Sequence, residues 1–443
     1  MAVKLPKLSK RVLTILIAVA AILVIIAIIS LIASLISDPN RLRYELITDE
    51  YIQELEAQTP NRQFACLDDY VGTYAVVDVK DTYRGGIFAK QKMTIPAQYK
   101  GKPVSSIISL QNLQKIKELE ISDGIVNITN SAFFGCTFTQ IDIPASVKFI
   151  GTYAFKECRS LESITLPAGV TTLSDGLFTE CRALTSVNMS SKVTSIGQYA
   201  FQNCQSLASI TLPAGVTAIS DGMFDGCAAL TDVPLENITS IGKDAFNGCE
   251  SLPIKAVDGV KYLGHGSNEY YAVVGNEVDA KDVTNVVINS NTKIIAVSAF
   301  ADSRKLASVV IPNSVTSLGS YAFANCTALT SVEIGSGLTE IPTYAFSGCT
   351  SLVTIEVPSS VKVINNYAFN GCTKLENVTL NAGLERLGSS IFASCAKLTS
   401  ITFNGTKAQW EAIKVGNTTS TRWNRNANNL KTVVCSGDEV VEL

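Results

Sequence analysis

The stretch that decides the fold is YAFSGCTSLVTIEVPSS, residues 344–360, in which Phe346, Cys349 and Leu352 stand three positions apart. The same three positions recur along most of the chain, and the cysteines are 22 or 23 residues apart except at one gap. They stand at Cys136, Cys158, Cys181, Cys204, Cys227, Cys249, Cys326, Cys349, Cys372 and Cys395. Tandem repetition at this period predicts a stack of similar coils in place of several separate globular domains.

One repeat contains a short alternating segment. In LESITLP, residues 161–167, apolar Ile164 and Leu166 alternate with polar Ser163 and Thr165, which predicts a strand with one face inward. A single unit cannot bury that face, but units stacked at about 4.8 Å bury it in continuous ladders. The predicted ladders include Phe155, Cys158, Leu161, Phe346, Cys349 and Leu352. The predicted fold is therefore a mainly β, α/β-like solenoid of about 12 coils at the leucine-rich repeat period.

The regular array has an interruption and two atypical ends. Around residues 253–279, VKYL and YYAVV flank GHGSNE, which predicts an inserted β-hairpin. A stack must cover its terminal apolar surfaces with atypical units. We therefore predict an N-terminal cap at 64–107, a repeat solenoid at 108–403 and a C-terminal cap at 404–443. Residues 38–63 are predicted to be a juxtamembrane linker or helix.

The N-terminus carries a long apolar run. Residues 12–37 contain no charge over 26 positions, enough to cross a hydrocarbon core of about 30 Å as a helix. The apolar region of a cleaved signal peptide, which is the alternative, normally has about 7–15 residues. Four Lys or Arg residues lie in the basic tail 1–11, so the positive-inside rule places that tail in the cytoplasm and the solenoid outside.

Composition argues against several classes of function. Lys plus Arg is 36 and Asp plus Glu is 39, and four of the basic residues lie before the apolar run. The remainder is net acidic and would repel nucleic acid. The chain has one histidine, His265, for which a solvated loop position is the expectation. We predict no enzymatic activity, no cofactor and no small-molecule substrate.

The cysteines allow three chemical interpretations, as metal ligands, disulfides or a redox catalyst. Zinc sites commonly use cysteines in close pairs, whereas no two cysteines here are closer than 22 residues. Parallel coils would direct the thiols alike, which is poor geometry for a disulfide. Ser303 also replaces cysteine in one repeat. We therefore predict buried, reduced, structural thiols.

Two rows of side chains are predicted at the surface. The outward strand positions carry mostly Ser and Thr and lack the Trp, Tyr and Arg anchors typical of tight interfaces. A second row precedes the Ala-Phe pairs and supplies the candidate partner contacts, although partial burial against the phenylalanines is the alternative. This row consists of Tyr153, Tyr199, Tyr321, Tyr344 and Tyr367.

The array resembles the BspA-like leucine-rich repeat class of surface proteins. The resemblance covers about residues 66–443 and rests on the repeat VTSIGxYAFxxCxxLxSIxLP, on IPAQYKGKPVSSI, on DGVKYLGHGSNEYYAVVG and on FNGTKAQWEAI. It implies a curved solenoid that adheres to matrix proteins or cells, and it implies no catalytic residue. The predicted function is binding of a protein or glycan partner by a single-pass, membrane-anchored surface protein. The alternative is a scaffolding component of the cell envelope.

Overall fold

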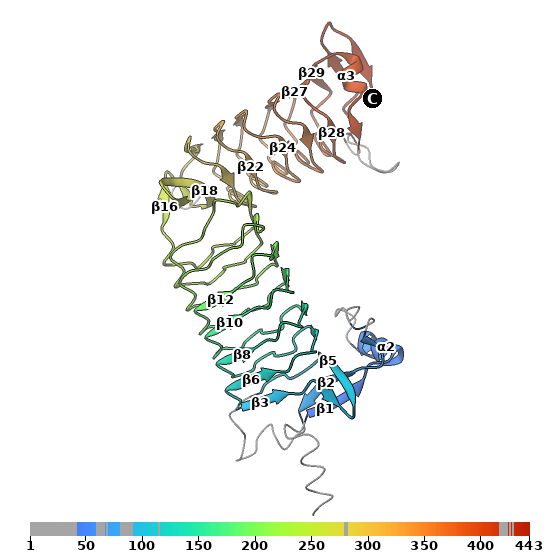
Figure 1. The fold of residues 1–443 in the computed structure, drawn as a ribbon. Coiled ribbons are helices and arrows are strands. Elements are labelled where there is room, and N and C mark those ends of the chain that lie inside the picture. The colour runs from blue at the N-terminus through green and yellow to red at the C-terminus, as the bar shows by residue number, and fades with distance from the viewer. Residues whose placement is uncertain are drawn as a thin grey trace, which may run out of the picture.

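The computed structural model describes residues 42–58, 67, 70–79, 92–113, 116–278, 282–415, 424, 427 and 429–443. They form a β-solenoid of about 13 turns, which confirms the predicted mainly β repeat fold (Figure 1). The tail 1–11 and the predicted transmembrane helix 12–37 lie outside the described residues. Within the described part of the chain, no helix is both long enough and apolar enough to cross a membrane.

Most coils contribute to two rows of strands, and the first row is reduced to an isolated bridge between Ser209 and Asp232 in two coils of the first half. The first row contains β3 (Lys92–Ile95), β6 (Glu118–Ile121), β8 (Gln140–Asp142), β10 (Ser163–Thr165), β12 (Ser186–Asn188), β19 (Asn285–Val287), β21 (Ser308–Ile311), β23 (Ser331–Ile334), β25 (Thr354–Val357), β27 (Asn377–Asn381), β29 (Ser400–Asn404) and β31 (Thr432–Cys435). The second row contains β7 (Asn127–Ile128), β9 (Phe149–Ile150), β11 (Thr172–Leu173), β13 (Ser195–Ile196), β14 (Ala218–Ile219), β15 (Ser240–Ile241), β20 (Ile294–Ile295), β22 (Ser317–Leu318), β24 (Glu340–Ile341), β26 (Val363–Ile364), β28 (Arg386–Leu387) and β30 (Lys414–Val415). Neighbouring coils pair in parallel, as between Ser163 and Ser186.

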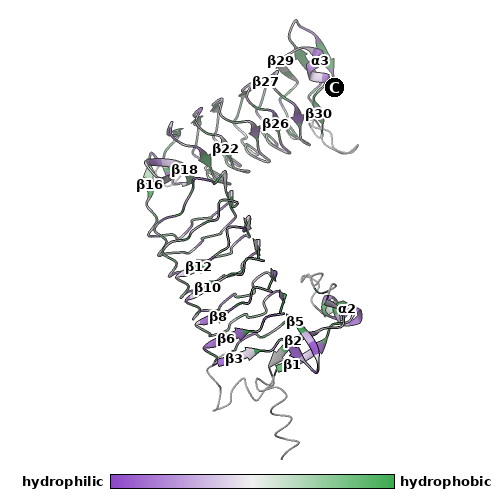
Figure 2. Ribbon diagram, in the orientation of Figure 1, coloured by the Kyte–Doolittle hydropathy of each residue, from purple (hydrophilic) through white to green (hydrophobic). Residues whose placement is uncertain are grey.

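The core consists of the ladders that the repeat predicts. In β10, Ile164 is buried between exposed Ser163 and Thr165. Phe346 is fully buried and stacks on Phe323 and Phe369 with ring centroids 5.4 and 5.5 Å apart. Hydrophilic and hydrophobic residues accordingly mix along every coil (Figure 2).

The cysteine ladder has a bonding role that spacing alone does not reveal. The Cys349 thiol donates a hydrogen bond to the backbone carbonyl of Phe323 in the preceding coil, with Sγ 3.2 Å from the oxygen. The other repeat cysteines each make the equivalent bond, as Cys181 does to Phe155 at 3.1 Å. All described cysteines are buried and free, while Cys66 lies outside the described residues. The Phe323 carbonyl also accepts the Cys326 N–H of its own coil at 3.4 Å, so the thiol adds a second bond that joins neighbouring coils. Cysteine thus combines a small apolar volume with a hydrogen-bond donor.

These thiols should resist alkylation while the chain is folded. Burial raises the pKa of Cys349 to about 12, and only the thiolate is nucleophilic. At pH 8 we expect iodoacetamide to modify Cys349 about a thousandfold more slowly in the native protein than in urea, because the thiolate fraction falls with each unit of pKa. Mass spectrometry of timed digests measures both rates. Equal rates in the two states would contradict the buried ladder.

The N-terminal cap begins earlier than the predicted boundary at residue 64. β1 (Leu42–Leu46) pairs antiparallel with β2 (Tyr74–Val79), which pairs with β5 (Lys102–Ile107), which in turn pairs antiparallel with β4 (Gln98–Tyr99). The helix α2 (Asp49–Gln58) buries Ile52 in a small cluster with Leu67 and Ile108. Part of the segment 38–63, predicted to be a juxtamembrane linker or helix, therefore covers the first coil, because its apolar residues pack there.

The C-terminal cap closes the other end of the stack. It contains α3 (Lys407–Glu411) and a final antiparallel strand, β32 (Val440–Glu442), which pairs with β31. Thr406 and Gln409 form a reciprocal capping box at the start of α3. Trp410 is buried and its ring lies edge-on to Phe403 at 5.2 Å. Trp423 lies outside the described residues.

The predicted hairpin separates the stack into two arms that meet at a bend (Figure 1). β16 (Ile254–Val257), β17 (Val260–His265) and β18 (Asn268–Asn276) form an antiparallel sheet, and β18 then pairs in parallel with β20. The hairpin thus occupies the position of one missing coil. We call the coils before it the first arm and those after it the second arm.

One side chain replaces the backbone of the missing coil. In regular coils a phenylalanine N–H donates to the next coil, as Phe300 does to the Ala322 carbonyl at 2.8 Å, and the phenylalanine carbonyl accepts a cysteine thiol. At the hairpin, Asn276 Nδ2 donates to the Ala299 carbonyl at 2.7 Å, and Asn276 Oδ1 accepts the Ser303 hydroxyl at 3.2 Å. The Asn276 amide therefore imitates both backbone groups, and the serine at the cysteine position is its partner.

Candidate functional site

Every regular coil has a turn position whose backbone is left-handed, and the tyrosine row occupies it. Tyr153, Tyr199, Tyr321, Tyr344 and Tyr367 all have φ between 56° and 58°. Other coils place Ser131, Gly176, Gly222, Asp244, Ser298 and Ser390 at this position, with φ between 53° and 59°. A bulky residue in this conformation is uncommon, with a cost of about 1–2 kcal/mol relative to glycine. The surrounding packing must offset that cost at each tyrosine.

Three of the tyrosines form a continuous stack, which we call the tyrosine stack. Tyr344 lies between Tyr321 and Tyr367, with ring centroids 4.7 and 4.8 Å apart and interplanar angles of 12° and 4°. Tyr321 is 42% exposed, and the other two are partly buried. Partial burial and the two neighbouring tyrosines raise the pKa of Tyr344 above its usual value. The stack therefore presents protonated hydroxyl groups and ring edges at the spacing of the coils.

The first arm spaces its tyrosines differently. Tyr153 and Tyr199 stand two coils apart, and no ring contact joins them within the described structure. A Cβ added at Gly176 would lie 2.0 Å from the Tyr153 ring, and one at Gly222 would lie 2.3 Å from the Tyr199 ring. Glycine at these positions thus leaves room for the ring of the preceding coil. Both tyrosines are 37% exposed, but each is separate from the other.

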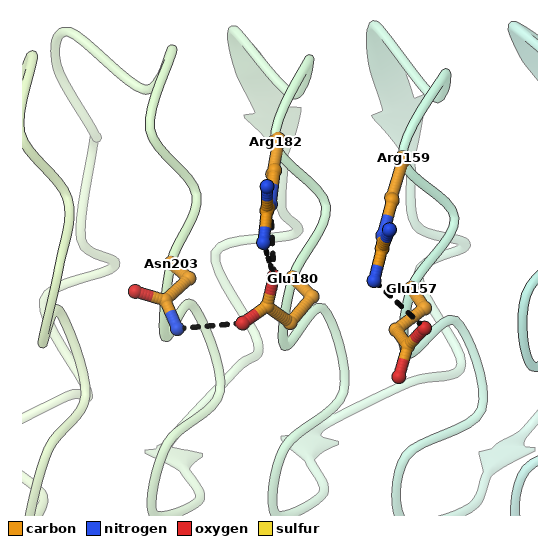
Figure 3. A network of polar contacts seen from close by, with 5 residues as sticks. All are labelled: Glu157, Arg159, Glu180, Arg182 and Asn203. Atoms are coloured by element: carbon orange, nitrogen blue, oxygen red, sulfur yellow. Dashed lines mark hydrogen bonds and ion pairs between the residues drawn. The ribbon is translucent and has the colours of Figure 1, made fainter.

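A polar ridge follows a second left-handed turn position on the first arm (Figure 3). Arg159 pairs with Glu157 at 3.1 Å, and Arg182 pairs with Glu180 at 2.8 Å. Asn203 donates to Glu180 at 2.8 Å. Partial burial raises the pKa of Glu180, but hydrogen bonds from Arg182 and Asn203 outweigh it and lower that pKa below its usual value. These pairs already satisfy one another, so the ridge offers few free charges to a ligand.

The remaining surface offers little chemistry. Among the described residues, no group of three or more His, Cys, Asp or Glu side chains could hold a metal ion. His265 is partly buried at the end of β17, where its Nδ1 accepts the Leu235 N–H at 3.4 Å and its Nε2 lies 3.5 Å from Glu236. It connects the hairpin to the preceding coil. The expected solvated loop position therefore differs from the observed one, because the hairpin packs back on the first arm.

The arrangement of the tyrosine row could have been foreseen only in part. Tyr321, Tyr344 and Tyr367 follow one another at 23 residues, so ring contact between adjacent coils is implied by the period. The left-handed backbone is also signalled, since Gly, Ser and Asp share the position. The role of the Asn276 amide could not be predicted, because Asn276 lies in the hairpin and occupies no repeat position. The sequence hints at it only through Ser303, which stands at a repeat position that cysteine occupies in the neighbouring coils.

The repeat has counterparts in known proteins. The sequence matches the BspA type leucine rich repeat region in 6 copies, over residues 126–253 and 280–413. A leucine rich cell surface protein from Faecalibacterium prausnitzii is 30% identical, with 78% of this chain and 94% of that one covered and a TM-score of 0.40. A leucine-rich repeat protein from Bacteroides ovatus is 24% identical, with 85% and 98% covered and a TM-score of 0.43. Among proteins with curated functions, none matches this sequence.

Proposed function

Since this chain belongs to the BspA-type leucine-rich repeat family, we propose that it is a non-catalytic binding protein of the cell surface, anchored by residues 12–37. Its solenoid lies outside the membrane and binds a protein or glycan partner. The basic tail 1–11 favours a cytoplasmic N-terminus. Recovery of a mature soluble form that begins near residue 38 would contradict the anchor.

The observation that carries this proposal is the tyrosine stack. Three large aromatic side chains stand partly exposed at a left-handed position where glycine is less strained and which other coils fill with glycine, serine or aspartate. Tyrosine combines apolar area with a hydroxyl group at low conformational entropy, and it is enriched at the energetic centres of interfaces. A partner that lies along several coils would meet three such residues at once. Binding of this kind is shallow and spread over the coils.

The proposal predicts a specific loss of binding. Serine occurs at the same left-handed position in Ser131, Ser298 and Ser390, so Tyr→Ser is compatible with the backbone. We expect the triple change at 321, 344 and 367 to weaken binding of the full-length protein to its best ligand on an array of host matrix proteins and glycans by about tenfold or more. The double change Tyr153→Ser and Tyr199→Ser is the matched control and should have a smaller effect.

Two outcomes would count against adhesion. Equal binding by both variants, with unchanged melting temperatures, would remove the tyrosine stack from the interface. Antibodies against the solenoid that bind cells only after the wall is stripped would favour the alternative, a scaffold within the envelope. The antibody experiment does not depend on identifying the ligand.

A further inference from the structure

A cleft opens at the bend, between the last coil of the first arm and the first coil of the second arm. Its volume is about 520 Å³, and its walls include Asp244, Phe246 and Gly248 on one side and Val297 and Ala299 on the other. Val274 of the hairpin contributes a third wall. The two coils still meet at one point, where the Val297 N–H donates to the Ile241 carbonyl at 2.9 Å. The cleft is therefore the part of the missing coil that the hairpin leaves unfilled.

The wall formed by the first arm presents backbone donors without acceptors. In the preceding coil the N–H groups of Gly222, Phe224 and Gly226 donate to the next coil at 2.8, 3.0 and 2.7 Å. In the last coil the equivalent residues are Asp244, Phe246 and Gly248, and their N–H groups have no acceptor within the described part of the chain. All three line the cleft. Three aligned donors thus face the space where a further coil would lie.

The opposite wall presents acceptors. In regular coils, the carbonyls equivalent to those of Val297, Ala299 and Ala301 accept bonds from the preceding coil. Asn276 satisfies the Ala299 carbonyl, whereas the carbonyl of Val297, which also lines the cleft, has no donor among the residues that the structure describes. A ligand that complements both walls must therefore carry donors and acceptors in alternation. Peptide backbone has this property.

The floor of the cleft is apolar and slightly open. Phe246, Cys249 and Leu252 are 5%, 5% and 6% exposed, whereas Phe224, Cys227 and Leu230 one coil earlier are 0% exposed. The ladder ends at this point, because no ring stacks on Phe246 from the hairpin side within the described residues. An apolar side chain placed there would extend the core.

Charge at the rim favours a peptide over an anion. Asp244 and Glu250 line the cleft, and its one lining cation, Lys261, pairs with Glu277 at 3.3 Å. Carboxylates beside the free N–H groups would repel a phosphate or carboxylate ligand. One coil takes up about 4.8 Å along the stack, so the space that the hairpin leaves suits a single backbone segment.

We infer that the cleft binds a neutral or basic peptide segment of a partner protein, which fills the space that the hairpin and Asn276 leave between the two arms. Its carbonyls accept the N–H groups of Asp244, Phe246 and Gly248, and one of its own N–H groups donates to the carbonyl of Val297. An apolar side chain covers Phe246. Backbone bonds to the open end of the first arm give affinity, as they do in strand addition, and the floor gives preference for an apolar residue. The site is separate from the tyrosine stack and does not rest on it.

The test uses the full-length protein and a synthetic peptide. The probe is a fluorescent peptide of residues 317–327, SLGSYAFANCT, with serine in place of Cys326, because it has the sequence of a regular coil. The control probe is the same peptide with alternate amides N-methylated, which removes donors while keeping the side chains. Fluorescence anisotropy should show saturable binding of the first peptide and binding weakened by at least about tenfold for the second.

Two protein variants locate the site. Val274→Trp fills the cleft and should abolish binding, whereas Val287→Trp, at a 72% exposed valine on β19, should leave it unchanged. Melting temperatures check that both variants fold. Absence of binding, equal affinity for both peptides, or binding by a folded Val274→Trp variant would each overturn the inference. Self-association that Val274→Trp abolishes would identify a second copy as the occupant and overturn the partner assignment.

Discussion

Replacing Phe346 with alanine is expected to lower the free energy of unfolding by about 3–5 kcal/mol. The ring is fully buried and stacks on Phe323 and Phe369 at interplanar angles of 2° and 4°. Its removal leaves a cavity and breaks two ring contacts, each worth about 0.5–1.5 kcal/mol beyond the buried area. The repeated geometry prevents the coils from collapsing into the cavity, because backbone hydrogen bonds hold this coil on both sides. The Phe323 N–H donates to the Ala345 carbonyl, and the Phe346 N–H donates to the Ala368 carbonyl.

Urea unfolding measures this loss, and hydrogen exchange shows where it occurs. In a stack each coil interacts only with its neighbours, so the loss of protection should concentrate in the coils around residues 323–369. Val353→Ala is the control, since Val353 is 37% exposed in the same arm and should change stability by less than about 0.5 kcal/mol. A Phe346→Ala variant as stable as the control would contradict a continuous phenylalanine ladder.

Replacing Asn276 with alanine is expected to lower the free energy of unfolding by about 2–4 kcal/mol. The change leaves the Ala299 carbonyl and the buried Ser303 hydroxyl without their partners, and it also removes the acceptor of the Val278 N–H at 3.0 Å. Each buried polar group that loses its hydrogen bond costs about 1–3 kcal/mol. The effect should appear at the start of the second arm.

A double-mutant cycle identifies the cause. Ser303→Ala removes the hydroxyl that Asn276 satisfies, so the combined variant should be more stable than the sum of the single changes by about 1 kcal/mol. Asn285→Ala, at an exposed asparagine on the neighbouring strand β19, is the control and should change stability little. Strict additivity of Asn276→Ala and Ser303→Ala would show that the Asn276 amide does not replace the missing coil.

The repeat made most of the fold predictable, because side-chain identity at a fixed period determines what is buried. Ile164, Phe346, Cys349 and Leu352 are all buried, as their spacing predicts. Hydrogen bonds between coils were not predictable in the same way. The period places Cys349 beside the preceding coil, but it does not show that the thiol reaches the Phe323 carbonyl.

The candidate site was predictable in its members and less so in its geometry. The repeat spacing identifies the five tyrosines. It does not show that three of them stack while Tyr153 and Tyr199 stay separate, a contrast that depends on glycine at the same position of the next coil. The cleft at the bend exists because the hairpin fills only part of the space of one missing coil. A missing coil can be counted in the sequence, but the N–H groups that it leaves free become visible only in three dimensions.

The thiol ladder also imposes an order of events on biosynthesis. Each repeat thiol is protected only after its coil has stacked on the preceding one, whereas the unfolded chain exposes all twelve cysteines. Thiolate attack on a disulfide proceeds readily from exposed cysteines. In an oxidising compartment the chain must therefore stack faster than it oxidises, since every premature cross-link removes a donor from the core and blocks propagation of the array. Once stacked, the repeat cysteines are inert, so their redox sensitivity belongs to the nascent chain.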